Sequence, residues 1–191
     1  MDRKASFSKF WVVPARIFAF GLAALPVGVA WADCRPVIAA YSAADATRHF
    51  ALYNVDSMTQ APKGEPIRVV VGDTDYLEND VRKGALEIVK DGYKKLPFVP
   101  GFEAKSVRVD EERGRVRCEP LGERTVGADV LIGYEVRSNN KGNVPDPYAN
   151  DLWVNKRTGL PAWYGMGSDG EGFRWVYGVQ AVAPTADKIR Q

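Results

Sequence analysis

Residues 151–179, DLWVNKRTGLPAWYGMGSDGEGFRWVYGV, are the most informative part of this 191-residue chain. Two stretches rich in Gly, Lys, Asp and Ser interrupt three runs of aromatic and β-branched residues. This pattern predicts a three-stranded antiparallel meander with strands Asp151–Asn155, Leu160–Met166 and Phe173–Val179. The joining turns are expected at 156–159 and 167–172.

The expected register makes both faces of this meander apolar. The expected cross-strand pairs are Val154 with Leu160, Leu152 with Ala162, Tyr164 with Trp175 and Met166 with Phe173. These side chains share one face with Tyr177, and the opposite face receives Trp153, Pro161 and Trp163. Because an antiparallel sheet usually exposes one face to water, we expect a helix or a ligand to cover the second face.

The rest of the chain predicts an α+β fold of one domain, residues 33–182, followed by a flexible polar tail, 183–191. Val37, Ile38, Tyr41 and Ala44 recur at helical spacing and predict an N-terminal helix over 35–47. Further strands are expected at 49–55, 66–71, 106–110, 115–119 and 128–137, with a hairpin between 106–110 and 115–119. Segment Asp80–Gly92 fits either a helix or two short strands. Residues 138–146 predict a polar loop.

The first 32 residues have the pattern of a cleavable signal peptide. A basic stretch ends at Arg16, an apolar run of about 14 residues follows, and Ala30-Trp31-Ala32 places small residues at a cleavage site before Asp33. A membrane-spanning helix needs roughly 20 apolar residues, which makes a retained anchor the weaker alternative. We therefore expect export to the periplasm by the general secretory (Sec-type) route, with no stable membrane span after processing.

Charge and composition exclude two classes of function. The first 32 residues hold four basic residues and one acidic residue, whereas the whole chain has a net charge of +2. The processed chain is therefore close to neutral and lacks the basic surface that nucleic acids or anionic membranes require. A single histidine excludes a site built from several histidines.

Cys34 and Cys118 are the only cysteines in the chain. An oxidising compartment favours a disulfide between them, and the chain-entropy model assigns such a long loop roughly 4–5 kcal/mol of stabilisation. The alternative is two unrelated thiols. No Cys-x-x-Cys motif is present, so thiol oxidoreductase chemistry is not expected.

Residues Leu152–Pro161, LWVNKRTGLP, resemble the turn W-[IVL]-[DNS]-x-x-T-G-L-P of the LolA-like superfamily of periplasmic proteins. That group includes lipoprotein carriers of the LolA type and envelope-stress regulators of the RseB type. Segment Cys118–Gly127 is similar to the part that precedes this turn in small exported proteins of the same kind. The resemblance extends loosely over 35–177, but its recognisable motifs lie in the last 60 residues or so and concern turns and sheet patterning.

This resemblance implies a strongly curved antiparallel sheet, an open half-barrel, with the N-terminal helix and, in one alternative, a second helix across its mouth. The apolar interior of such proteins accepts acyl chains. The candidate residues for lining such a cavity here are Tyr134, Leu152, Tyr164, Met166, Phe173, Trp175 and Tyr177. Arg68 and Arg174 are candidates to orient a ligand headgroup.

Motifs for catalysis, cofactors and metals are incomplete in this sequence. His49 is the single imidazole, and no G-x-S-x-G nucleophile motif accompanies it. Residues 165–170 match G-x-G-x-x-G, but no helix is expected after them to bind phosphate. Residues 73–84 begin like a calcium loop and then lack its ligands. We therefore expect no catalytic residues, no cofactor and no metal site.

The leading hypothesis is a non-catalytic, carrier-like periplasmic protein that holds a lipid or acyl chain in a half-barrel cavity. The alternative is a protein-interaction module in cell-envelope assembly or stress sensing, which would bind an envelope protein through a sheet edge or the face of Trp153 and Trp163. A hydrolase acting on cell-wall or lipid material is a third hypothesis, which would need converging carboxylates in an open cleft.

Overall fold

In the computed structural model, the structure describes residues 33–83, 87–138, 149–167 and 170–190. The predicted signal peptide, 1–32, and residues 139–146 of the expected polar loop lie outside them. Within the described residues, no helix is long and apolar enough to cross a membrane.

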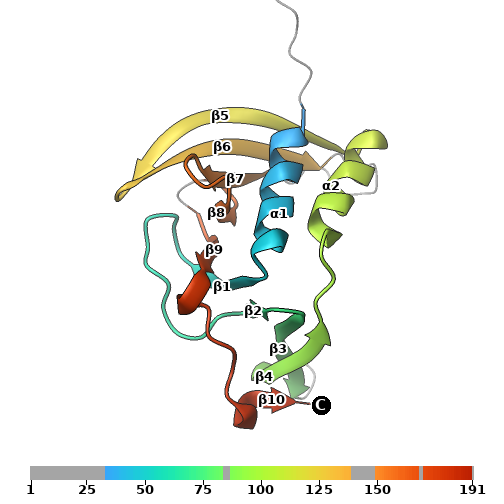
Figure 1. The fold of residues 1–191 in the computed structure, drawn as a ribbon, viewed down its shortest axis with the longest axis vertical. Helices are drawn as coiled ribbons and strands as arrows, with labels where there is room; N and C mark the ends of the chain where they lie inside the picture. Colours follow the sequence, from blue (N-terminus) through green and yellow to red (C-terminus); the bar gives the residue numbers. More distant parts are fainter. Residues whose placement is uncertain (1–32, 84–86, 139–148, 168–169, 191) are drawn as a thin grey trace, which may run out of the picture. The chain divides into compact units, whose positions relative to one another are not determined.

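The described residues form two α-helices and a ten-stranded, mostly antiparallel sheet (Figure 1), so the predicted α+β class is confirmed. The helices are α1 (Arg35–Thr47) and α2 (Phe102–Glu112), and two 3-10 turns are η1 (Gly178–Gln180) and η2 (Ala186–Lys188). The strands are β1 (His49–Val55), β2 (Arg68–Val71), β3 (Thr74–Lys83), β4 (Glu87–Pro97), β5 (Val116–Val126), β6 (Asp129–Ser138), β7 (Ala149–Asn155), β8 (Pro161–Gly165), β9 (Gly172–Tyr177) and β10 (Ile189–Arg190).

The sheet is open, in the order β10-β4-β3-β2-β1-β9-β8-β7-β6-β5, and it is not strongly curled. The strongly curved half-barrel expected from the resemblance is therefore a wrong prediction. Strands β3 and β4 pair with each other and extend the sheet beyond β2, in a part of the chain where a helix across the mouth of the half-barrel was one of the two alternatives. Of the two alternatives for Asp80–Gly92, the pair of strands is the correct one.

Helix α1 has the bounds that the spacing of its apolar residues predicts. It buries Val37, Ile38, Ala40 and Ala44 and ends at Thr47, followed by Arg48, whose φ of 47° is left-handed. The second helix comes from an unexpected segment, because α2 replaces the first strand of the hairpin predicted at 106–110. Ala104 and Val107, three residues apart on α2, pack into the cluster that contains the buried face of α1. Glu111 on α2 also accepts a hydrogen bond of 2.8 Å from the Cys34 backbone N–H.

The predicted meander is confirmed as β7, β8 and β9, but its predicted register is wrong by two residues. Leu152 pairs with Tyr164, and Tyr164 pairs with Phe173. The first turn is longer than expected because Asn155 Oδ1 accepts the backbone N–H groups of Arg157 and Thr158, which leaves Leu160 in the turn. Since side chains alternate with a period of two, this shift leaves Leu152, Tyr164 and Trp175 on the helix side and Trp153 and Trp163 on the opposite side, as predicted. A bulge between Trp153 and Val154 breaks the alternation, and Ala162 packs with the tryptophans instead of on the predicted face of Leu152.

Different parts of the chain cover the two faces of the sheet. On the helix side, Leu152 and Val154 pack with the disulfide and with α1 and α2. On the opposite side, Trp153 and Trp163 pack with Met58 from the segment between β1 and β2. The chain itself thus covers the second face of the meander.

The segment expected as a flexible tail, 183–191, contains η2 and β10. Strand β10 pairs in parallel with β4, and Arg190 Nε donates to Asp91 Oδ1 at 3.0 Å. Just before it, Ala181 is buried against the sheet in a cluster with Ala51 and Val69. Its carbonyl oxygen lies 2.8 Å from His49 Nε2. The C-terminal segment therefore covers the β1–β2 part of the sheet on the side away from the helices.

Glycines make room for the two buried indoles. A Cβ added at Gly133 on β6 would lie 2.8 Å from the Trp153 ring. At Gly165 and Gly172 it would lie 2.6 and 2.7 Å from the Trp163 ring. Both tryptophans are almost fully buried, with 5% and 1% exposure, so neither ring has space to move aside.

We predict that Gly133→Ala lowers the free energy of unfolding by about 1–3 kcal/mol, because the new methyl group overpacks the Trp153 site. In a Trp153→Phe protein, Gly133→Ala is expected to lower the free energy of unfolding much less, because the smaller phenylalanine ring lacks the indole atoms that the new methyl group would meet. Urea denaturation of all four proteins gives this double-mutant cycle. Equal costs of Gly133→Ala in both backgrounds would contradict the assignment.

The disulfide between Cys34 and Cys118 is present, as predicted. It joins the start of α1 to β5 across 84 residues of chain, with a Cα–Cα distance of 5.0 Å.

Replacing both cysteines by alanine is expected to lower the free energy of unfolding by about 2–5 kcal/mol, because the unfolded chain gains conformational freedom. Chemical denaturation measures this loss, and the reduced wild-type protein is the control that should match the variant. A variant as stable as the oxidised wild type would show that the bridge does not stabilise the fold.

Candidate functional site

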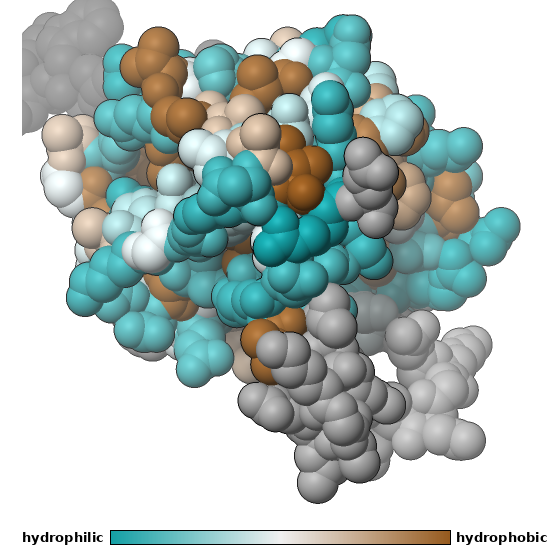
Figure 2. Space-filling view, turned by 90° about the horizontal axis from the view of Figure 1, so that it is seen from below, coloured by the Kyte–Doolittle hydropathy of each residue, from teal (hydrophilic) through white to brown (hydrophobic). Residues whose placement is uncertain are grey.

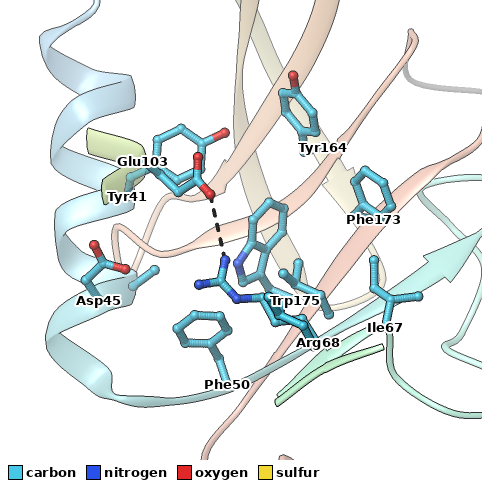
Figure 3. Close-up of a pocket in the computed structure, with 12 residues that line it drawn as sticks. Tyr41, Asp45, Phe50, Ile67, Arg68, Glu103, Tyr164, Phe173 and Trp175 are labelled. Carbon is cyan, nitrogen blue, oxygen red and sulfur yellow. Dashed lines mark ion pairs between the residues drawn. The ribbon is translucent and has the colours of Figure 1, made fainter. Parts of the chain in front are cut away.

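A cavity of about 310 Å³ lies between the two helices and the sheet (Figure 3). Five aromatic residues form much of its wall: Tyr41, Phe50, Tyr164, Phe173 and Trp175. Aliphatic side chains complete the wall: Ala44, Leu52, Ile67 and Leu77. They come from α1, β1, β3, β8, β9 and the segment before β2, so distant parts of the chain build one largely apolar site.

The aromatic residues are held by contacts with one another. The rings of Tyr164 and Phe173 are stacked, with centroids 6.5 Å apart and planes 9° from parallel. Tyr41 on α1 lies 6.5 Å from Trp175 on β9, so it connects the helix to the floor of the cavity. Burial raises the pKa of Tyr41 and that of Tyr164, which keeps both hydroxyls neutral at physiological pH.

Three charged residues also face the cavity: Asp45, Arg68 and Glu103. Arg68 Nη2 donates to Asp75 Oδ2 at 2.7 Å, and its Nε donates to both carboxylate oxygens at 3.1 Å. Its remaining nitrogen, Nη1, points toward Glu103 Oε1 at 3.7 Å (Figure 3). The guanidinium also lies 5.8 Å from the centre of the Phe50 ring. Arg68 is thus fixed from one side and faces the cavity with the other.

Asp45, near the end of α1, connects the two helices. Its Oδ2 accepts the backbone N–H of Gly101, the residue before α2, at 2.6 Å. Burial raises the pKa of the Asp45 carboxyl, although this hydrogen bond and the charge of Arg68 act in the opposite direction. The net effect is that folding disfavours the charged form of Asp45.

A second, more open cavity of about 510 Å³ adjoins the first. Tyr164 and Phe173 line both cavities, and Met166, 63% exposed, lines the second. The stacked pair therefore stands between the two spaces.

The seven candidate cavity residues divide into two groups. Tyr164, Phe173 and Trp175 line the first cavity, and Met166 lines the second. The other three, Tyr134, Leu152 and Tyr177, pack in the core: Leu152 is fully buried, Tyr134 packs against the same cluster, and the Tyr177 hydroxyl donates to the Pro161 carbonyl at 2.9 Å.

Of the two arginines expected to orient a headgroup, only Arg68 faces the cavity. Arg174 points to the other side of the sheet, where its Nη1 donates to the carbonyl oxygens of Met58 and Gln60. It therefore holds the segment that covers the tryptophans.

Sequence reasoning missed the contributions of Asp45 and Glu103. Asp45 follows Ala44 and lies four residues after Tyr41, so the helical spacing of α1 carried a signal for it. Glu103 lies in α2, which the sequence pattern did not predict, and no signal for it was present.

Within the described part of the chain, no cluster of three or more His, Cys, Asp or Glu residues is arranged to hold a metal ion. His49 lies on β1 beside the C-terminal segment and does not line the first cavity.

No protein-family model matches this chain, and no curated protein matches it. The likeness to the LolA-like superfamily therefore rests on the two sequence segments Leu152–Pro161 and Cys118–Gly127.

We predict that Asp45→Asn becomes more stabilising, relative to wild type, as the pH rises. A carboxyl whose pKa is raised by folding contributes stability below its unfolded pKa of about 3.8, and this contribution is lost as the pH rises through the raised value. The asparagine still accepts the Gly101 N–H but carries no charge to desolvate. Urea denaturation of both proteins between pH values below 3.8 and neutrality measures the difference. A difference that does not change with pH, or that falls, would contradict the effect of burial on Asp45.

Proposed function

We propose that this protein is a non-catalytic, carrier-like protein of the periplasm that holds a lipid or acyl chain in the cavity between its helices and its sheet. The observation that carries the proposal is the aromatic wall that α1, β1, β8 and β9 build around an unfilled space. Core side chains normally interlock with few voids larger than a water molecule. A space of this size, with apolar walls and a few polar groups, is typical of small-molecule sites, which span roughly 300–1,000 Å³.

The opening of the cavity also supports a ligand with a long apolar part. Phe173, at the boundary of the two cavities, is 37% exposed, and Met166 beyond it is 63% exposed. Large apolar side chains that stay in contact with water next to a cavity gain stability when a ligand covers them. An acyl chain that starts in the first cavity and passes the Tyr164–Phe173 pair would bury both residues.

The disulfide supports the proposed location. Structural disulfides persist in oxidising compartments such as the bacterial periplasm and are rare in the cytosol. Both cysteines are buried in the helix-side core, in the same cluster as Leu152. This placement agrees with a permanent structural role after export.

The position of β5 at the end of the described sheet favours a second candidate, a module that binds a protein of the cell envelope. Among the described strands, this 11-residue strand is the last of the sheet, and the edge of a sheet can accept another strand. A bulge between Pro120 and Gly122 interrupts it, however, and such features protect an edge from pairing. The other expected binding surface is a wrong prediction, because Trp153 and Trp163 are buried. The face seen in Figure 2 is mostly hydrophilic, with hydrophobic residues in separate small groups.

Asp45 and Glu103 bear on the third candidate, a hydrolase, because both carboxylates face the same cavity. Each already has a partner in the structure: the Gly101 N–H for Asp45 and the Arg68 guanidinium for Glu103. These contacts connect the helices to each other and to the sheet, which favours a structural role for the pair over a catalytic one.

We predict that the uncharged fluorescent probe N-phenyl-1-naphthylamine binds the wild-type protein and that Leu77→Phe weakens binding by about tenfold or more. Leu77 lines the cavity from β3, so a larger ring at this position takes up ligand space. The matched control is Leu121→Phe, the same substitution at a 42% exposed position on β5. Fluorescence titration measures all three proteins.

Two results would contradict the proposed function. One is a wild-type protein that does not bind the probe. The other is an equal loss of binding in Leu77→Phe and Leu121→Phe, which would place the binding surface outside the cavity.

A further inference from the structure

The Arg68 guanidinium has N–H hydrogen-bond donors on its cavity side that Asp75 does not engage. A guanidinium carries five N–H donors, and Asp75 engages those of Nε and Nη2. Among the described residues, Nη1 makes no hydrogen bond, because Glu103 Oε1 at 3.7 Å is near enough to attract it but too far to accept one. A ligand oxygen that enters the cavity therefore meets an oriented donor.

The charge around this donor is not positive, although Arg68 itself is. Asp75, whose side chain is 9% exposed, compensates the charge of Arg68 with a two-pronged contact. Glu103 and Asp45 then add negative charge on the cavity side of the same guanidinium. A carboxylate headgroup at Nη1 would have to displace Glu103 and would remain close to the Glu103 carboxylate, whose negative charge repels it, with Asp45 on the same side of the cavity.

A cationic headgroup meets a different obstacle. The Arg68 guanidinium already lies 5.8 Å from the centre of the Phe50 ring and next to Glu103. The guanidinium thus occupies the position, against an aromatic face and beside a carboxylate, that would best stabilise the cation of a ligand. A cation of the ligand would therefore face Arg68 at short range.

We propose that Glu103 makes the cavity selective for amphiphiles with an uncharged, carbonyl-bearing headgroup, an ester or an amide, over amphiphiles with an anionic headgroup. The carbonyl oxygen accepts a hydrogen bond from Arg68 Nη1 and brings no charge into the field of Glu103 and Asp45. The apolar chain of the ligand lies along Trp175 and the Tyr164–Phe173 pair toward the second cavity (Figure 3). This inference rests on the proposed function, because it assigns the headgroup of a ligand held in that cavity.

The test is displacement of N-phenyl-1-naphthylamine from the full protein by three amphiphiles with the same apolar chain length, each below its micelle concentration. These are monolauroylglycerol, laurate and dodecyltrimethylammonium. For the wild-type protein, monolauroylglycerol is expected to displace the probe at a concentration lower than either charged amphiphile by about tenfold or more. In Glu103→Gln, the affinity for laurate is expected to rise by about tenfold, while that for monolauroylglycerol changes by less than about threefold.

Glu112→Gln is the matched control, because it removes the same charge from an exposed position of the same helix, outside the cavity. It is expected to leave the preference of the wild type unchanged. Circular dichroism of each variant checks that the fold is retained, and Glu103 is half-exposed, so its replacement leaves no buried gap.

The inference is overturned if the wild-type protein binds laurate as tightly as monolauroylglycerol, or if Glu103→Gln leaves the affinity for laurate unchanged. A rise in laurate binding of equal size in Glu112→Gln would also overturn it, since the effect would then come from net charge alone. If the probe and all three amphiphiles fail to bind the wild-type protein, the proposed function itself fails. Binding without headgroup preference would leave the proposed function standing and remove only the role of Glu103.

Discussion

The central strands β7, β8 and β9 carry large apolar side chains on both faces, and this requires the chain to bury both. Leu152 and Trp175 face the helices, whereas Trp153 and Trp163 face the opposite side. Truncating a buried aromatic side chain typically costs about 3–5 kcal/mol, so leaving either face open to water would be a large loss for one domain. The helices are tied over the first face by the disulfide and by Glu111. On the other face, the segment that carries Met58 is held by Arg174.

The two coverings differ in how well they fill the space beneath them. On the tryptophan side, glycines on neighbouring strands let the indoles lie directly on the sheet, and the remaining space there is only about 30 Å³. On the helix side, α1 and α2 pack well where Leu152 and the disulfide lie, but they leave a cavity near Arg68 and Phe173. The unfilled space thus lies where the two helices meet the sheet at its β1, β2 and β9 strands. Three partly exposed charged side chains, Asp45, Arg68 and Glu103, line it among the aromatic residues.

Local patterns predicted the elements that local forces determine. The spacing of Val37, Ile38, Tyr41 and Ala44 was sufficient for α1. The tryptophans of the meander lie on their predicted face because a two-residue shift of register does not change the side on which a residue lies, whereas Ala162, next to the bulge, does not. Helix α2 was missed because its alternating valines resemble a strand, and contacts with α1 override this preference. The C-terminal segment was predicted as a flexible tail because the residues that it contacts, His49 and Asp91, are distant from it in sequence. Of the five aromatic wall residues, the meander pattern predicted Tyr164, Phe173 and Trp175, whereas Tyr41 and Phe50 were not among the candidates. Glu103 depended on a helix that only the tertiary structure reveals.

Native mass spectrometry of the protein, expressed as the full chain in a bacterial host and purified without detergent, tests the central claim most directly. We expect a fraction of the molecules to carry one added mass that organic extraction releases and identifies as an uncharged amphiphile with an ester or amide group. The fraction should fall when Leu77 is replaced by phenylalanine. A homogeneous protein without added mass, whose cavity also stays empty after incubation with uncharged lipids, would contradict the account.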